Sequence, residues 1–194
     1  MKGPGQGSTT DSPRGAASAI LPTMGSPTSV GAMYPDWPQY AERISVAVRG
    51  LTTEQLALRA GPDHLPIWGL AAHTAGARTY WLCGVFGEPG AETTPFPDPF
   101  AELGWEDDEA HPRSADELAW ALDSTWAVLA GCLDRWTTDM LAENFERRYR
   151  DAVQVHTRGS VLNRLFSHDA YHTGEISQVL GVHGLPAIDL WRRM

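Results

Sequence analysis

Apolar residues recur every three or four positions along four long stretches of the chain, and this period predicts four long helices. The helices are expected at about residues 38–50, 66–87, 114–136 and 158–180. The second is apolar nearly all round, which predicts that it is the most buried of the four. Four such segments favour an all-α fold, a four-helix bundle.

Residues that typically begin or end helices stand at the edges of these stretches. Ser114 and Glu117 form the S-x-x-E pattern of a capping box before the third helix. Asp36 can cap the first helix, and Pro66 suits the first turn of the second. Gly181 is expected to stop the last helix.

The segments between the long helices are of three kinds. Residues 51–60 and 137–145 predict short helices, whereas residues 146–157 alternate weakly, as a strand would. Residues 88–113 form a long, Pro-rich, acidic connection between the second and third helices. A crossover of this length inside a domain is often functional, for instance a lid.

The first 33 residues are rich in Gly, Ser, Thr and Pro and show no sustained apolar period. Such a segment buries too little surface to offset its ordering entropy, so we predict a disordered and dispensable N-terminal arm over 1–33. The remaining residues, 34–194, are expected to form one helical bundle domain, which is an ordinary size for a single core.

The composition of the chain argues against two classes of binding partner. A formal net charge of −9 and a pI near 5.1 argue against nucleic acid and anionic membrane surfaces. The apolar runs are far shorter than the ~20 residues that span a bilayer, so we expect a cytoplasmic protein. Cys83 and Cys132 lack metal-ligand spacing, and we expect both to be reduced thiols rather than a disulfide.

Three histidines stand where a metal site could form. His168 and His172 are four residues apart in "HDAYH", so a helix brings both imidazoles to one face. His73 lies in the most apolar helix, where an unpartnered imidazole would cost about 1–3 kcal/mol. Three inward histidines from two helices can leave coordination positions open, as a catalytic metal requires. The alternative is a set of neutral core histidines with ordinary partners.

Two carboxylates near these histidines are candidate catalytic residues. Asp169 or Glu175 could move protons at the site, and Asp169 could instead orient a histidine by accepting its second ring N–H. The alternative is that both are ordinary polar residues or partners of Arg78 and Arg164. The segment does not fit the H-E-x-x-H helix of metalloproteases, because the shorter Asp169 replaces the glutamate.

Aromatic residues near the histidines could line a substrate pocket. Tyr80 follows His73 by two helical turns, Trp81 is its neighbour, and Tyr171 adjoins His172. With eight tryptophans in the chain, burial in an aromatic core is the alternative explanation.

The segments "AAHTAGARTYW" and "HDAYHTGEI" together resemble the DinB-like (YfiT-like) superfamily over about residues 34–182. The resemblance implies a four-helix bundle, with the long crossover connection between its second and third helices, that often forms a homodimer. It also implies a divalent metal ion, zinc or alternatively nickel, on His73, His168 and His172. Glu175 stands where glutamine is more usual in the family.

Relatives of this kind include thiol S-transferases and the mycothiol-dependent maleylpyruvate isomerase. The resemblance therefore implies a metal-dependent enzyme that transfers or activates a small thiol of the mycothiol type, since a metal lowers the pKa of a bound thiol. Two alternatives stay open: a metal-dependent hydrolase of a small substrate, and a non-enzymatic metal- or ligand-binding stress protein. The expected partner is a small-molecule substrate in the first two cases.

Overall fold

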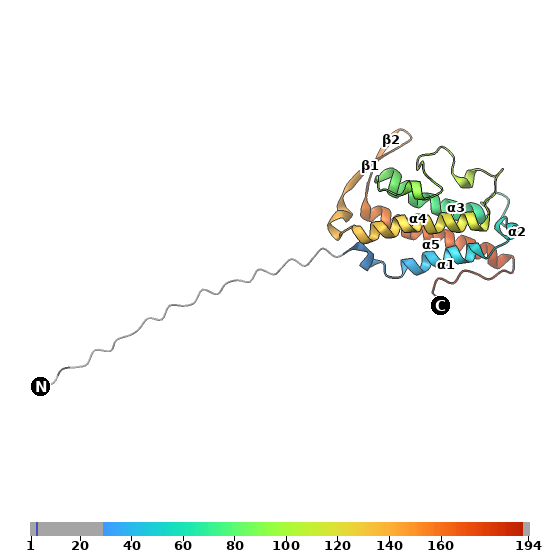
Figure 1. The fold of residues 1–194 in the computed structure, drawn as a ribbon, viewed down its shortest axis with the longest axis horizontal. Helices are drawn as coiled ribbons and strands as arrows, with labels where there is room; N and C mark the ends of the chain where they lie inside the picture. Colours follow the sequence, from blue (N-terminus) through green and yellow to red (C-terminus); the bar gives the residue numbers. More distant parts are fainter. Residues whose placement is uncertain (1–2, 4–28, 192–194) are drawn as a thin grey trace.

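The computed structural model describes Gly3 and residues 29–191, and this part of the chain is mostly helical (Figure 1). Four long helices pack along one another: α1 (Trp37–Arg49), α3 (Ile67–Thr79), α4 (Ala115–Arg135) and α5 (Arg158–Val182). The first, third and last predicted helices are confirmed, because their ends differ from α1, α4 and α5 by no more than two residues.

Local sequence explains where these helices begin. Ser114 and Glu117 form the predicted capping box of α4, in which each side chain accepts a hydrogen bond from the other's backbone N–H. Thr157 and Ser160 do the same for α5. Asp36 occupies the cap position of α1, but its side chain makes no capping hydrogen bond.

The second predicted helix changes its winding before it ends. It is α-helical to Thr79 and continues as a π-helical turn over Tyr80–Val85. Ten of the 13 residues of α3 are buried, which confirms the prediction that this helix is the most buried of the four. Ala71, Ala72 and Ala75 are fully buried, and their small side chains allow neighbouring helices to approach closely.

The all-α prediction is incomplete because the structure contains an antiparallel hairpin. Strands β1 (Asn144–Tyr149) and β2 (Ala152–Thr157) pair with each other before α5. The weak alternation over 146–157 covers β2 and all of β1 except Asn144 and Phe145, which were predicted to end a short helix, and no Gly or Asn marks the turn. Arg150 instead adopts the left-handed conformation there, with φ of 54°, which sequence patterns for hairpins do not anticipate.

Both predicted short helices are shorter in the structure. The first is reduced to α2 (Thr53–Leu56), which Thr52 and Gln55 cap, and the second is a 3₁₀ turn at Thr138–Ala142. Within the described residues, no helix combines the length and hydropathy that a membrane span requires.

The N-terminal boundary predicted at residue 34 is too late. Ser29 pairs with Thr137 in an isolated bridge, and Val30–Met33 form a 3₁₀ turn. The side chain of Val30 is fully buried against the apolar cluster that includes Trp136. A single buried residue produces no apolar period, so the sequence could not reveal this contact. Apart from Gly3, the rest of the predicted arm lies outside the described residues.

The long connection between α3 and α4 packs along α3. The ring of Phe96 lies 3.8 Å from the position that a Cβ atom at residue 76 would occupy, in place of Gly76. The rings of Phe96 and Trp105 pack against each other at a tilted angle. A 3₁₀ turn at Trp105–Asp107 contacts α3. The glycine at position 76 thus leaves room for the connection to lie over the helix that carries His73.

Candidate metal centre

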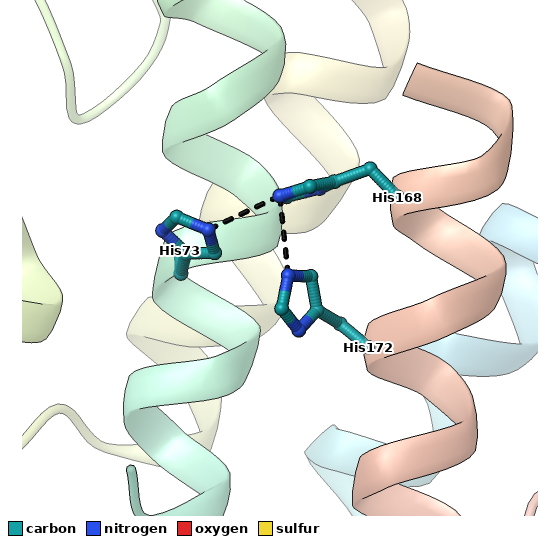
Figure 2. Close-up of side chains that lie close together, drawn as sticks. All are labelled: His73, His168 and His172. Atoms are coloured by element: carbon teal, nitrogen blue, oxygen red, sulfur yellow. Dashed lines mark hydrogen bonds between the residues drawn. The ribbon is translucent and has the colours of Figure 1, made fainter. Parts of the chain in front are cut away.

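Three histidines from two helices converge on one point (Figure 2). His73 comes from α3, whereas His168 and His172 come from successive turns of α5. Nε2 of His168 lies 3.1 Å from Nε2 of His73 and 3.1 Å from Nε2 of His172. Ligand atoms of the three residues all lie within 4.8 Å of one another. Nitrogens bound to one ion at ~2.0–2.1 Å are separated by about 3 Å, so this spacing suits shared coordination.

The second ring nitrogens of two of these histidines are held by carboxylates. Nδ1 of His73 lies 2.8 Å from Oε1 of Glu106, and Nδ1 of His172 lies 2.6 Å from Oε2 of Glu175. Since a carboxylate accepts, each Nδ1 carries the proton and each Nε2 presents a lone pair. Nε2 of His168 faces both lone pairs and can donate to only one of them. A cation at this point would satisfy all three nitrogens.

Burial and neighbouring charges set the pKa values of the three rings. Burial, reinforced by the nearby histidines and arginines, lowers the pKa of His168 to about 3. Burial also lowers the pKa of His172, although Glu175 opposes this. The hydrogen bond to Glu106 outweighs burial and raises the pKa of His73. His168 and His172 are therefore neutral at neutral pH, which is the form that binds metals.

Asp169 does not serve the histidines as predicted. Its carboxylate accepts a hydrogen bond from Nε1 of Trp37 at 2.9 Å and two from the guanidinium of Arg78. The side chain is buried in the core and makes no hydrogen bond to any of the three imidazoles. The predicted orientation of a histidine by Asp169 is therefore wrong, and the alternative, a partner of Arg78, is confirmed.

Glu175 does reach the candidate site, because it accepts from Nδ1 of His172. Its side chain is one-third exposed, at 34 %, so solvent can exchange protons with it. The contact gives Glu175 a role in orienting His172. Proton transfer by Glu175 stays a prediction.

Sequence reasoning missed Glu106, which makes the corresponding contact with His73. This residue belongs to the 3₁₀ turn of the long connection, 33 residues away from its partner along the chain. Burial opposes ionisation, but the hydrogen bond from His73 prevails and lowers the pKa of Glu106. The only signal in the sequence was the length and acidity of the connection, which indicates a functional segment without identifying the residue.

A cavity of about 860 Å³ opens onto His73 and His168. The π-helical turn contributes Tyr80 and Trp81 to its wall, which confirms that these two aromatic residues line a pocket. Phe96 and Trp105 of the long connection and Tyr149 of β1 also line the cavity. The volume falls within the range of small-molecule sites. Tyr171 does not line the cavity, and its side chain is exposed against the ring of His172.

The two cysteines lie apart from the histidines and form no disulfide. Burial raises the pKa of Cys132 to about 12 and that of Cys83 to about 11. Both thiols are therefore protonated at neutral pH and are poor nucleophiles. Neither cysteine lines the cavity beside the histidines.

Comparison with known proteins is consistent with this geometry. The sequence profile of the DinB superfamily matches residues 39–176, a range that contains all three histidines. The crystal structure of a DinB-like protein from Bacillus cereus ATCC 10987 has the same fold, with a TM-score of 0.62, 18 % sequence identity, and coverage of 82 % of this chain and 95 % of that chain. No functionally curated protein matches the chain.

Proposed function

Because the chain belongs to the DinB superfamily, we propose that it is a metal-dependent enzyme that activates a small external thiol. We also propose an architecture for the chain. In it, α1, α3, α4 and α5 form a four-helix bundle, and the long connection crosses from α3 to α4. The proposed ligands are the Nε2 atoms of His73, His168 and His172. The proposed ion is zinc, with nickel as the alternative.

The convergence of three Nε2 atoms beside an open cavity is the observation that supports this proposal most strongly. Three imidazoles that present Nε2 satisfy part of the coordination of a divalent ion and leave positions for a substrate. A purely structural cluster of histidines would not need to open onto a cavity. A divalent ion bound there would supply Lewis acidity, which lowers the pKa of a coordinated thiol into the neutral range.

The residues of the chain have separate tasks in this proposal. Glu106 and Glu175 fix the tautomers of His73 and His172, so that both present Nε2 to the ion. The aromatic wall formed by Tyr80 and Trp81 keeps bulk water away from one side of the reacting atoms. Glu175, which is partly exposed, is the candidate for passing the thiol proton to solvent.

Two arguments support an external thiol as a substrate. They are the resemblance to thiol-dependent enzymes and the protonated form of the chain's own cysteines. Because Cys132 is buried, Cys83 is partly buried and neither lines the cavity, the proposal takes the nucleophile from a second substrate. A hydrolase would instead use water at the same position. A binding protein would hold the ion without reacting.

The test is a titration of the cobalt-loaded protein, prepared without a histidine tag and followed by its visible absorption spectrum. Mycothiol is compared with its analogue in which oxygen replaces sulfur. We expect the thiol to shift the cobalt bands and the oxygen analogue to leave them unchanged, with His168→Ala showing neither response. Cobalt bands that ignore the thiol would contradict thiol activation, and a protein that takes up no cobalt would contradict the metal site itself.

A further inference from the structure

Two arginines line the same cavity as the histidines. Arg147 extends from β1 and Arg164 from α5, and Figure 1 places the hairpin beside the C-terminal end of α3. Arg164 precedes His168 by four residues, so the two side chains lie one turn apart on the same face of α5.

Aromatic rings hold both guanidinium groups in place. The Cζ atoms of Arg147 and Arg164 lie 4.8 and 5.0 Å from the ring centre of Trp81. Nε of Arg147 also donates a hydrogen bond of 2.6 Å to the hydroxyl of Tyr80. Cation–π contacts and a neutral phenol orient these charges but do not neutralise them.

Neither arginine has an acidic partner in the part of the chain that the structure describes. Six other arginines do reach a carboxylate within 4 Å: Arg49, Arg59, Arg78, Arg113, Arg135 and Arg158. Asp98, Glu102 and Asp107 line the same cavity, yet none makes an ion pair with either guanidinium group. The chain carries a net charge of −9, and these two cations lie on the wall of one cavity without forming an ion pair.

We propose that Arg147 and Arg164 bind the carboxylate of a small organic acid, whose apolar part lies against the aromatic wall of the cavity. A guanidinium group offers paired N–H donors that match a carboxylate. Tyr80, Trp81 and Phe96 supply the apolar contacts. The proposal extends the proposed function by naming the substrate class, and it rests on that function for the reaction at the histidines.

The test compares two probes of nearly the same shape, phenylacetate and its neutral amide, phenylacetamide. Binding of each is measured by calorimetry to the zinc-loaded and to the chelator-treated protein. Each substitution removes hydrogen bonds between a guanidinium group and the carboxylate. We therefore expect Arg147→Gln and Arg164→Gln each to weaken phenylacetate binding by about tenfold to a hundredfold. Phenylacetamide binding should change little. Arg148→Gln is the matched control, because Arg148 is the next residue of β1 and does not line the cavity.

The two preparations separate this proposal from the metal proposal. We expect the wild-type protein to prefer phenylacetate to phenylacetamide with or without zinc, and both arginine variants to lose that preference while their circular dichroism spectra stay unchanged. The preference for phenylacetate could instead persist in Arg147→Gln and Arg164→Gln and disappear when zinc is removed. This result would mean that the carboxylate binds the ion, and it would overturn the proposal. Equal affinity for the two probes, or binding of neither, would also overturn it. Failure to bind zinc would contradict the proposed function alone.

Discussion

Arg78 and Asp169 form a buried ion pair that joins the two helices of the histidine site. Nε and one terminal nitrogen of the guanidinium group donate to the two carboxylate oxygens at 3.3 and 2.9 Å, and both side chains are at most 5 % exposed. Arg78 follows His73 on α3 by five residues, and Asp169 directly follows His168 on α5. The pair therefore fixes the relative position of the backbone segments that present these two histidines.

Removing the charge of Asp169 should destabilise the fold strongly. Asp169→Asn leaves the buried guanidinium group of Arg78 without its counter-ion, which predicts a loss of about 3–5 kcal/mol in the free energy of unfolding. Urea denaturation measures this loss. Asp123→Asn is the control, because Asp123 pairs with Arg49 on the surface and both side chains are about half exposed. That variant should lose less than about 1 kcal/mol. Equal losses in the two variants would contradict the assignment.

Glu106 should contribute to metal affinity although it does not contact the ion. Glu106→Ala removes the acceptor that fixes the tautomer of His73, so the affinity for zinc should fall by about 10–100-fold. Competition with a chromophoric chelator measures this change. Glu109→Ala is the control from the same connection, since Glu109 is exposed and pairs with Arg59. An unchanged affinity in Glu106→Ala would show that the tautomer of His73 is fixed by other means.

The two cysteines should react slowly with thiol reagents in the native protein. Burial disfavours the charged thiolate, so the pKa values of about 12 for Cys132 and about 11 for Cys83 lie above the working pH. Below these values the thiolate fraction, and with it the labelling rate, should rise about tenfold for each pH unit between 7 and 10. In denaturant both thiols return to an ordinary pKa of about 8.5 and should label promptly at pH 8. A native labelling rate at pH 7 equal to the denatured rate would contradict the burial of these thiols.

The sequence was sufficient to predict the long helices and the shared face of His168 and His172, because both depend on local spacing. An amphipathic period and caps such as Ser114 define a helix without knowledge of its neighbours. His168 and His172 share a face because they are four residues apart. The position of His73 opposite them follows from the packing of α3 against α5, which the family resemblance implied and the structure confirms.

The features that the sequence did not predict depend on long-range contacts. Glu106 reaches His73 only because the connection folds back over α3, and Val30 is buried only because the chain passes beside Trp136. Asp169 was placed correctly on α5, but its partner could not be chosen from spacing alone. The carboxylate of Asp169 binds Arg78, because the buried charge of that guanidinium group requires a counter-ion inside the core.

The metal content of His168→Ala shows directly whether His73, His168 and His172 bind one divalent ion. Wild-type protein and the variant, both prepared without a histidine tag and equilibrated with zinc, are analysed for metal per chain and for helicity by circular dichroism. His111→Ala is the control, because His111 is exposed and pairs only with Asp108. We expect one zinc ion per chain in the wild type and in His111→Ala, and loss of most zinc from His168→Ala with its helicity unchanged. Full zinc occupancy in His168→Ala would rule out a metal site built on these three histidines.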